Sequence, residues 1–449
     1  MVEVTRAVEN SVGAGFDTVA EEQGAALASQ PQVVAVLDAD AGRKGHRQLS
    51  LSGGALSSTA MVDAIRARPA PKPNSVAATL FATVSRGTLT IVDAGGRAVA
   101  STYFNAATDT YKLGDGLVAI VRRGGDDNAD ARPIEVYAAG RGKIVDTYVT
   151  DYKLVGDRIV LRRNKDLDAY DASGHKLVSG LADDYEVSRG LIAYRLGREL
   201  TVLDASGKPV VRGWAERYSV GDDVVAFQEG RSVKAYDRTG KALGSVDFGG
   251  EFEAGKTAVF ARTGGRELKV FGAAQGGEVT SAPARTYVQS AHLLARENGG
   301  HVEVVALDGP RAGDVIASAR ASAYDVSDEL AVLADGTYVQ VFDRTGKALF
   351  ADRVDAYELS DRLMAYRQGG AVGAVAADGR KIAPQTGGNF AVGDGIVVVQ
   401  RPYDVAIYRP GASDPVLSVA GSKFVVSGNT AAVYDNHGMV TLYRADRTA

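Results

Sequence analysis

Seven arginines recur at the ends of short apolar segments, and their spacing makes them the first candidates for ligand chemistry in this sequence. They are Arg122, Arg162, Arg195, Arg262, Arg296, Arg367 and Arg401. Guanidinium groups bind carboxylates and phosphates through paired hydrogen bonds. If repeated elements place these arginines around one face, that face would bind an anionic ligand.

A structural role for the same arginines explains the sequence better. The residue just before a recurrent aromatic and the residue ten after that aromatic change together. Opposite positions of a two-stranded antiparallel hairpin interact in this way, and ion pairs there are worth up to about 1 kcal/mol. We therefore expect cross-strand ion pairs rather than an anion site. The covarying pairs are Asp151 with Arg162, Asp184 with Arg195, Glu251 with Arg262, Ala323 with Ala334, and Arg217 with Gln228.

The other residue types capable of chemistry form no recognisable site. The chain has no cysteine, which excludes disulfides and thiolate chemistry. None of His46, His175, His292, His301 and His437 stands in a metal-binding motif, so we predict no metal and no cofactor. Two acidic clusters lack the calcium-loop pattern and are interpreted as solvated loops. They contain Asp38 and Asp40, and Asp126, Asp127, Asn128 and Asp130.

A repeat of about 33 residues organises most of the chain, and such periods are typical of repeat architectures. An aromatic, a short apolar stretch and a Gly/Ser/Asp turn recur at spacings of 41, 33, 33, 34, 35, 37, 33, 33 and 34 residues. The aromatics are Tyr111, Tyr152, Tyr185, Tyr218, Phe252, Tyr287, Tyr324, Tyr357, Phe390 and Phe424.

One repeat can be divided into four strands between Tyr185 and Arg217. The segments YEVS, LIAYR, LTVLD and PVVRGW are rich in β-branched and aromatic residues and are bounded by Gly, Asp and Ser. The turn between the third and fourth strands recurs as DASGHK, DASGKP and DRTGKA, in which Gly supplies a positive φ. Four short antiparallel strands per repeat are typical of a propeller blade. A β-solenoid is the alternative, but its turns are shorter.

The pattern resembles the WD40-like and quinoprotein-like propeller repeats in the broad sense, over residues 79–446. The resemblance implies an all-β β-propeller of ten to eleven short blades, as one large ring or two tandem propellers. The Gly-His and Trp-Asp signatures of true WD40 repeats are missing, and Trp214 is the only tryptophan. The tryptophan docking motif of the quinoprotein enzymes is also missing, so their cofactor is not implied.

Residues 1–78 differ from the repeat array of residues 79–449. Segments 4–28 and 57–67 are predicted to be helical, and a Pro-rich linker starts at Arg68. Residues 32–52 contain two strand-like runs, QVVAVLDA and RQLSLS. The array lacks one fourth strand at its end and one first strand at its start. These runs would supply them and so remove exposed strand edges.

Composition narrows the functional classes. A net charge of −4 and a pI near 5.9 give no basic surface for nucleic acid. No stretch reaches the about 18 apolar residues of a membrane helix, and the N-terminus is not a secretory signal, so the compartment stays open. There is no G-x-S-x-G elbow and no Gly-rich phosphate loop.

We therefore expect a non-catalytic scaffold whose partner is a protein, with a glycan as a second ligand class. The alternatives are a structural component of an extracellular or particle assembly, docked through residues 1–78, and a lyase or hydrolase with its site in the central channel. The loops between second and third strands, and those leaving the fourth strand, vary most between repeats. We expect them to carry recognition, because a rigid scaffold holds them.

Overall fold

The chain folds almost entirely into short strands. The computed structural model describes residues 34–37 and 80–444, apart from 86, 94–97, 124–130, 248–249, 265, 422, 428 and 435–439. Within these residues the single helical element is the one-turn 3-10 helix η2 (Gly309–Arg311), and no helix is long and apolar enough to cross a membrane. The predicted helices, the linker and RQLSLS lie outside the described residues, as do His46, His437 and the two acidic clusters.

The sheet of β13 (Asp184–Val187), β14 (Ile192–Leu196), β15 (Glu199–Leu203) and β16 (Pro209–Trp214) represents the repeat. Its strands pair antiparallel in chain order, and they match the four predicted segments to within a residue or two. Among the described residues there are ten four-stranded sheets and one of three strands. This confirms the expected all-β array of ten to eleven units.

The strands divide between two compact units, residues 1–183 with 437–442, and residues 184–436 with 443–449. The first unit contains β1 (Val34–Leu37), β2 (Leu80–Ser85), β3 (Thr88–Asp93), β4 (Ala98–Tyr103), β5 (Thr110–Leu113), β6 (Leu117–Val121), β7 (Arg132–Ala138), β8 (Gly142–Val149), β9 (Asp151–Val155), β10 (Arg158–Arg163), β11 (Asp166–Asp171) and β12 (Lys176–Leu181). Its complete sheets are β5 to β8 and β9 to β12, and β2 to β4 form the sheet of three strands.

The second unit continues the array from β13. Its further strands are β17 (Arg217–Val220), β18 (Val224–Glu229), β19 (Ser232–Asp237), β20 (Ala242–Asp247), β21 (Phe252–Ala254), β22 (Ala258–Arg262), β23 (Glu267–Gly272), β24 (Gly277–Pro283), β25 (Thr286–Gln289), β26 (Leu293–Asn298), β27 (His301–Ala306), β28 (Val315–Arg320), β29 (Ala323–Val326), β30 (Leu330–Asp335), β31 (Tyr338–Asp343), β32 (Ala348–Arg353), β33 (Ala356–Leu359), β34 (Leu363–Gln368), β35 (Ala371–Ala376), β36 (Lys381–Thr386), β37 (Phe390–Gly393), β38 (Ile396–Gln400), β39 (Val405–Tyr408), β40 (Leu417–Val419), β41 (Lys423–Ser427) and β42 (Thr430–Tyr434).

The strand β1 falls inside QVVAVLDA, the run expected to complete the last repeat. The sheet order is β1-β43-β42-β41, where β43 is Val440–Arg444. Here β1 takes the place of a fourth strand. Whether residues 32–52 close one ring stays a prediction, because the partner run RQLSLS is outside the described residues.

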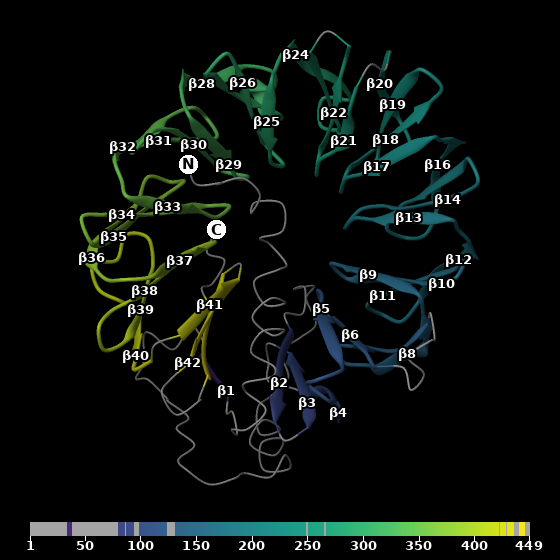
Figure 1. Ribbon diagram of the computed structural model, residues 1–449, viewed down its shortest axis with the longest axis horizontal. Coiled ribbons are helices and arrows are strands. Elements are labelled where there is room, and N and C mark those ends of the chain that lie inside the picture. The colour runs from purple at the N-terminus through teal and green to yellow at the C-terminus, as the bar shows by residue number, and fades with distance from the viewer. Residues whose placement is uncertain are drawn as a thin grey trace. The chain divides into compact units, whose positions relative to one another are not determined.

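The hydrophobic core lies between the faces of successive sheets. Second strands carry mostly apolar, buried residues, as in β6, where all five residues are buried, because neighbouring sheets cover both faces. In the second unit, Val224 and Ala226 of β18 pack in one cluster with Val259 and Ala261 of β22. Figure 1 shows the sheets β13 to β40 following one another, with the first strands β17 and β21 side by side at one edge.

The repeated turn between third and fourth strands is closed by its own residues. The Asp237 carboxylate accepts hydrogen bonds from the backbone N–H groups of Thr239 (2.8 Å) and Lys241 (3.0 Å) and from the Thr239 hydroxyl (2.6 Å). Burial acts to raise the pKa of Asp237, but these hydrogen bonds outweigh it and lower the pKa. Gly240 has φ +86°, and a Cβ there would lie 2.2 Å from the carbonyl oxygen of Val210. The turn motif therefore serves the scaffold.

Candidate functional site

The first and second strands of each four-stranded sheet pair in the register that was predicted by counting from the recurrent aromatic. Asp151 lies opposite Arg162, and Asp184 lies opposite Arg195. The carboxylate of Asp151 is 3.7 Å from Arg162 Nη2, and that of Asp184 is 3.1 Å from Arg195 Nε. Both expected pairs are therefore within ion-pair distance.

The third expected pair, Glu251 with Arg262, is not formed among the described residues, and that prediction is wrong. The Arg262 guanidinium instead donates to the carbonyl oxygens of Ala284 (2.7 Å) and Arg285 (2.9 Å). Its carbon centre also lies 5.3 Å from the centroid of the Tyr287 ring. Backbone carbonyls and an aromatic face of the next repeat thus take the place of the carboxylate.

Arg195 combines both kinds of contact. Besides Asp184, it donates to the carbonyl oxygens of Ala215 (3.2 Å) and Glu216 (2.6 Å), which lie in the connection to the next sheet. The Tyr218 hydroxyl of that next sheet donates to Asp184 at 2.6 Å. Burial, and then this hydrogen bond, raise the pKa of Tyr218, so the phenol stays protonated. The cluster of Arg195, Asp184 and Tyr218 therefore fastens one blade to the next.

The seven arginines do not share one face of their sheets. Arg162, Arg195, Arg262 and Arg367 stand ten residues after the aromatic, whereas Arg296 stands nine after and Arg122 and Arg401 eleven after. Alternate residues of a strand point to opposite faces, so the last three lie on the other face. Their pairings agree, because Tyr287 rather than Thr286 lies opposite Arg296.

The arginines of this second face pair within their own sheets or with the preceding one. Arg122 binds Asp109 at 3.1 Å and Glu135 at 2.6 Å. The buried Arg296 binds Glu303 at 2.8 Å, and Arg401 binds Asp404. Arg367 lies opposite Ala356, and its guanidinium makes no ion pair with any described residue. Most of the guanidinium groups are thus engaged at contacts within or between blades.

The two ends of each blade differ in what they expose. We call the end with the second-to-third-strand loop and the exit of the fourth strand the loop end, and the opposite end the turn end. Every exposed aromatic among the described residues is at a loop end. These are Tyr103 (71 % exposed), Tyr148 (54 %), Trp214 (65 %), Tyr338 (42 %) and Tyr403 (92 %). Loop variability in the sequence predicted recognition at the loop end, but these aromatic side chains were not among the predicted site residues.

The exposed fourth-strand residues occupy equivalent positions. Tyr103 lies opposite Thr88, Tyr148 opposite Pro133, Leu181 opposite Asp166 and Trp214 opposite Glu199. Each is followed within one residue by a buried position that ends the pairing, such as Phe104 or Ala182. Four consecutive repeats therefore place a large apolar side chain in solvent at the same point of the blade.

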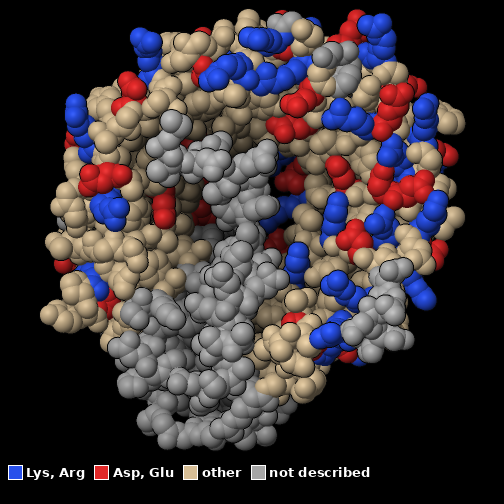
Figure 2. Space-filling view, viewed as in Figure 1, with Lys and Arg blue, Asp and Glu red and all other residues tan. Residues whose placement is uncertain are grey.

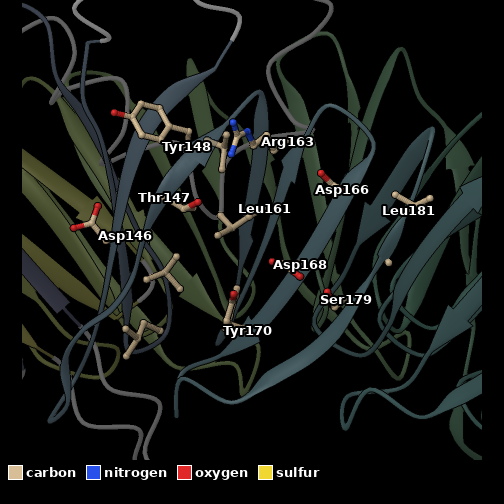
Figure 3. Close-up of a pocket in the computed structure, with 14 residues that line it drawn as sticks. Asp146, Thr147, Tyr148, Leu161, Arg163, Asp166, Asp168, Tyr170, Ser179 and Leu181 are labelled. Carbon is tan, nitrogen blue, oxygen red and sulfur yellow. The ribbon is translucent and has the colours of Figure 1, made fainter.

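A cleft of about 700 Å³ lies between β8 and the sheet β9 to β12, entirely within the first unit. Figure 3 shows Arg163 at one end of the cleft, with Asp166, Asp168, Ser179 and Leu181 along the wall formed by β11 and β12. Its volume is within the roughly 300–1,000 Å³ of small-molecule sites. None of these residues stood out in the sequence, because Arg163 and Asp166 look like ordinary hairpin residues.

Two of the described histidines form hydrogen bonds with other side chains. His292 Nδ1 is 2.6 Å from Asp308, and His301 Nε2 is 2.5 Å from the Ser318 hydroxyl. Within the part of the chain that the structure describes, no three His, Asp or Glu side chains are grouped closely enough to hold a metal ion. On the face in Figure 2, basic and acidic residues are interspersed rather than gathered by sign.

Repeated four-stranded antiparallel sheets that pack face to face define this chain as a β-propeller repeat protein. Residues 129–239 match the model of the 10-bladed beta propeller domain family. No curated protein matches the chain in sequence.

Solved structures with low sequence identity are similar to parts of the chain. Hsv2 of Kluyveromyces lactis is 12 % identical with a TM-score of 0.29, covering 66 % of this chain and 97 % of Hsv2. BamB from Moraxella catarrhalis is 14 % identical with a TM-score of 0.27, covering 58 % and 96 %. A eukaryotic initiation factor is 11 % identical with a TM-score of 0.38, covering 77 % and 96 %.

Proposed function

We propose that this protein is a non-catalytic propeller scaffold that binds a protein partner through the loop ends of its blades. The observation that carries the proposal is the placement of the exposed aromatics. All five are at loop ends, and Tyr and Trp are the residues that dominate binding energy at protein interfaces. Because these side chains are exposed, they contribute little to the stability of the fold and are available to a partner.

The turn ends have the opposite character. Their repeated Asp residues are already satisfied by backbone N–H groups and hydroxyls of the same turn, as Asp204 is by Ser206 and Lys208. The exposed large apolar residues there are only Val315 and Val416 among the described residues. A side chain whose hydrogen bonds are used within its own turn has little to offer a partner.

Substituting three equivalent loop-end residues tests the proposal. Tyr103→Ser, Tyr148→Ser and Trp214→Ser together are expected to reduce recovery of a co-purifying partner from the native cells by more than tenfold, since interface hot spots are worth about 2 kcal/mol or more each. Quantitative mass spectrometry of the tagged protein measures the loss. The side chains are exposed, so folding should be unchanged within about 0.5 kcal/mol.

The matched control is Val315→Ser with Val416→Ser, which removes the exposed apolar residues of the turn ends. This variant is expected to retain the partner at the wild-type level. Equal loss in both variants, or full retention in the loop-end variant, would count against a loop-end interface.

A further inference from the structure

We propose that the cleft between β8 and the sheet β9 to β12 binds a neutral saccharide. Tyr148 of the interface proposed above also lines this cleft, but the groups that carry the present proposal are not among the loop-end aromatics. The feature that carries it is a guanidinium, a carboxylate and two hydroxyls that make no hydrogen bond or ion pair among the described residues and that face one cleft: Arg163, Asp166, Thr147 and Ser179.

Strand register brings the polar groups of one wall together. Arg163, Asp166 and Leu181 lie opposite one another across β10, β11 and β12, and Leu161, Asp168 and Ser179 form the next row. Positions two residues apart along a strand share a face, so both rows line the same wall. The bottom of the cleft is apolar there, because Leu161 lines it and packs in one core cluster with residues of the preceding sheet.

Strand β8 provides the opposite wall. Val145 and Val149 pack in the same core cluster as Leu161, so the face of β8 that carries them is turned toward β10. Alternation places Thr147 on that face as well. Asp146 and Tyr148 also line the cleft, but alternation places them on the other face of β8, and Figure 3 shows both turned away from β10 to β12. The ligand-facing hydroxyl of this wall is therefore that of Thr147.

Other repeats use the equivalent groups internally. In the preceding sheet Glu135, at the position of Asp168, is bound by Arg122 at 2.6 Å and Lys143 at 3.2 Å. In the sheet β25 to β28, Arg296 binds Glu303, and His301 contacts Ser318. By contrast, Arg163 and Asp166 are cross-strand neighbours that form no ion pair. In this cleft the Arg163 guanidinium and the Asp166 carboxylate are therefore available to donate to and accept from a ligand.

The balance of charge selects the ligand class. Lys176 binds Asp168 at 3.0 Å, Lys143 binds Asp146 at 2.6 Å, and Arg163 offsets the charge of Asp166, so positive and negative charges balance along the cleft. An anionic or cationic ligand would gain one charged contact and meet one repulsive charge. Sugar hydroxyls both donate and accept, so a single neutral saccharide satisfies Arg163, Asp166 and the two hydroxyls together. The apolar faces of Leu161 and Leu181 suit the C–H face of a pyranose ring.

The test uses an array of neutral gluco-, galacto-, manno- and N-acetylglucosamine oligosaccharides, with uronic-acid and sulfated oligosaccharides as the anionic set. We expect binding to a neutral member, measured by calorimetry, that weakens about tenfold or more in Arg163→Ala with Asp166→Ala. The control Glu199→Ala, at the position of Asp166 in the next sheet, should change affinity less than about twofold.

The absence of cysteine gives a second readout. Ser179→Cys introduces a single thiol into the cleft, and the bound saccharide is expected to slow its modification several-fold. Circular dichroism of each variant checks folding. The proposal is overturned if no neutral member binds at millimolar concentration, if only anionic members bind, or if binding survives the Arg163 and Asp166 substitutions and leaves the Ser179→Cys thiol unprotected.

Discussion

Gly221→Ala is expected to lower the free energy of unfolding by about 3 kcal/mol or more, at the upper end of what overpacking costs. A Cβ at Gly221 would lie 1.7 Å from the carbonyl oxygen of Gly255 in the corresponding turn of the next blade. The Gly221 carbonyl is also held by the buried Ser188 hydroxyl of the previous blade at 2.6 Å. Since neighbouring turns fix it on both sides, the turn cannot move aside.

Gly230→Ala is the matched control for this effect. Gly230 has φ +61°, but nothing lies within 4 Å of a Cβ placed there, so the cost should be about 1 kcal/mol from backbone conformation alone. Chemical denaturation followed by circular dichroism measures both variants. If Gly221→Ala costs no more than Gly230→Ala, the blades are not packed turn against turn as described.

Arg195→Ala is expected to cost about 2–4 kcal/mol, because it removes several charge-assisted hydrogen bonds at once. The carbonyl oxygens of Ala215 and Glu216 and the carboxylate of Asp184 would all lose this donor. Tyr218 would also lose the guanidinium that lies 5.8 Å from its ring centroid. The effect should appear as lower stability of the blades on either side.

Arg198 provides the comparison, because its side chain in the next loop is exposed and makes no hydrogen bond or ion pair with the described residues. Arg198→Ala should change stability by less than about 0.5 kcal/mol. Under the alternative in which Arg195 belongs to an anion site, its loss would leave the stability of the free protein unchanged and abolish the stabilisation that bound sulfate provides. Denaturation with and without sulfate distinguishes the two roles.

The sequence predicted the blade and its register well, because both depend on local patterns. Apolar runs bounded by Gly, Asp and Ser located the four strands, and counting from Tyr152 and Tyr185 placed Asp151 opposite Arg162 and Asp184 opposite Arg195. The same count also holds for Ala323 opposite Ala334. Each repeat of the chain thus gave a further example of the same cross-strand register.

The errors came from acceptors that side-chain patterns cannot show. Arg262 binds backbone carbonyls 22 and 23 residues further on, and any residue type there provides the same oxygen. The division of the arginines between two faces was present in the sequence, since Arg296 is nine residues after its aromatic and Arg401 eleven. All seven arginines come at the end of a second strand, and the prediction therefore treated them as one group.

The cleft was beyond sequence reasoning for a different reason. Arg163 and Asp166 have opposite charges at cross-strand positions, which predicts an ion pair. That the pair stays open, and that Thr147 of another sheet faces it, follows only from packing between sheets. The exposure of the loop-end aromatics could not be predicted for the same reason, because the burial of a side chain depends on neighbours outside its own repeat.

Site-specific photocrosslinking in the native cells tests the loop-end interface most directly. A benzophenone amino acid is placed at Tyr103, Trp214 and Tyr403 at loop ends, and at Val315 and Val416 at turn ends. All five positions are exposed, so incorporation itself should be tolerated. The proposed function predicts that the same partner protein is captured from the loop-end positions and not from Val315 or Val416. Capture confined to the turn ends, or equal at both ends, would contradict it.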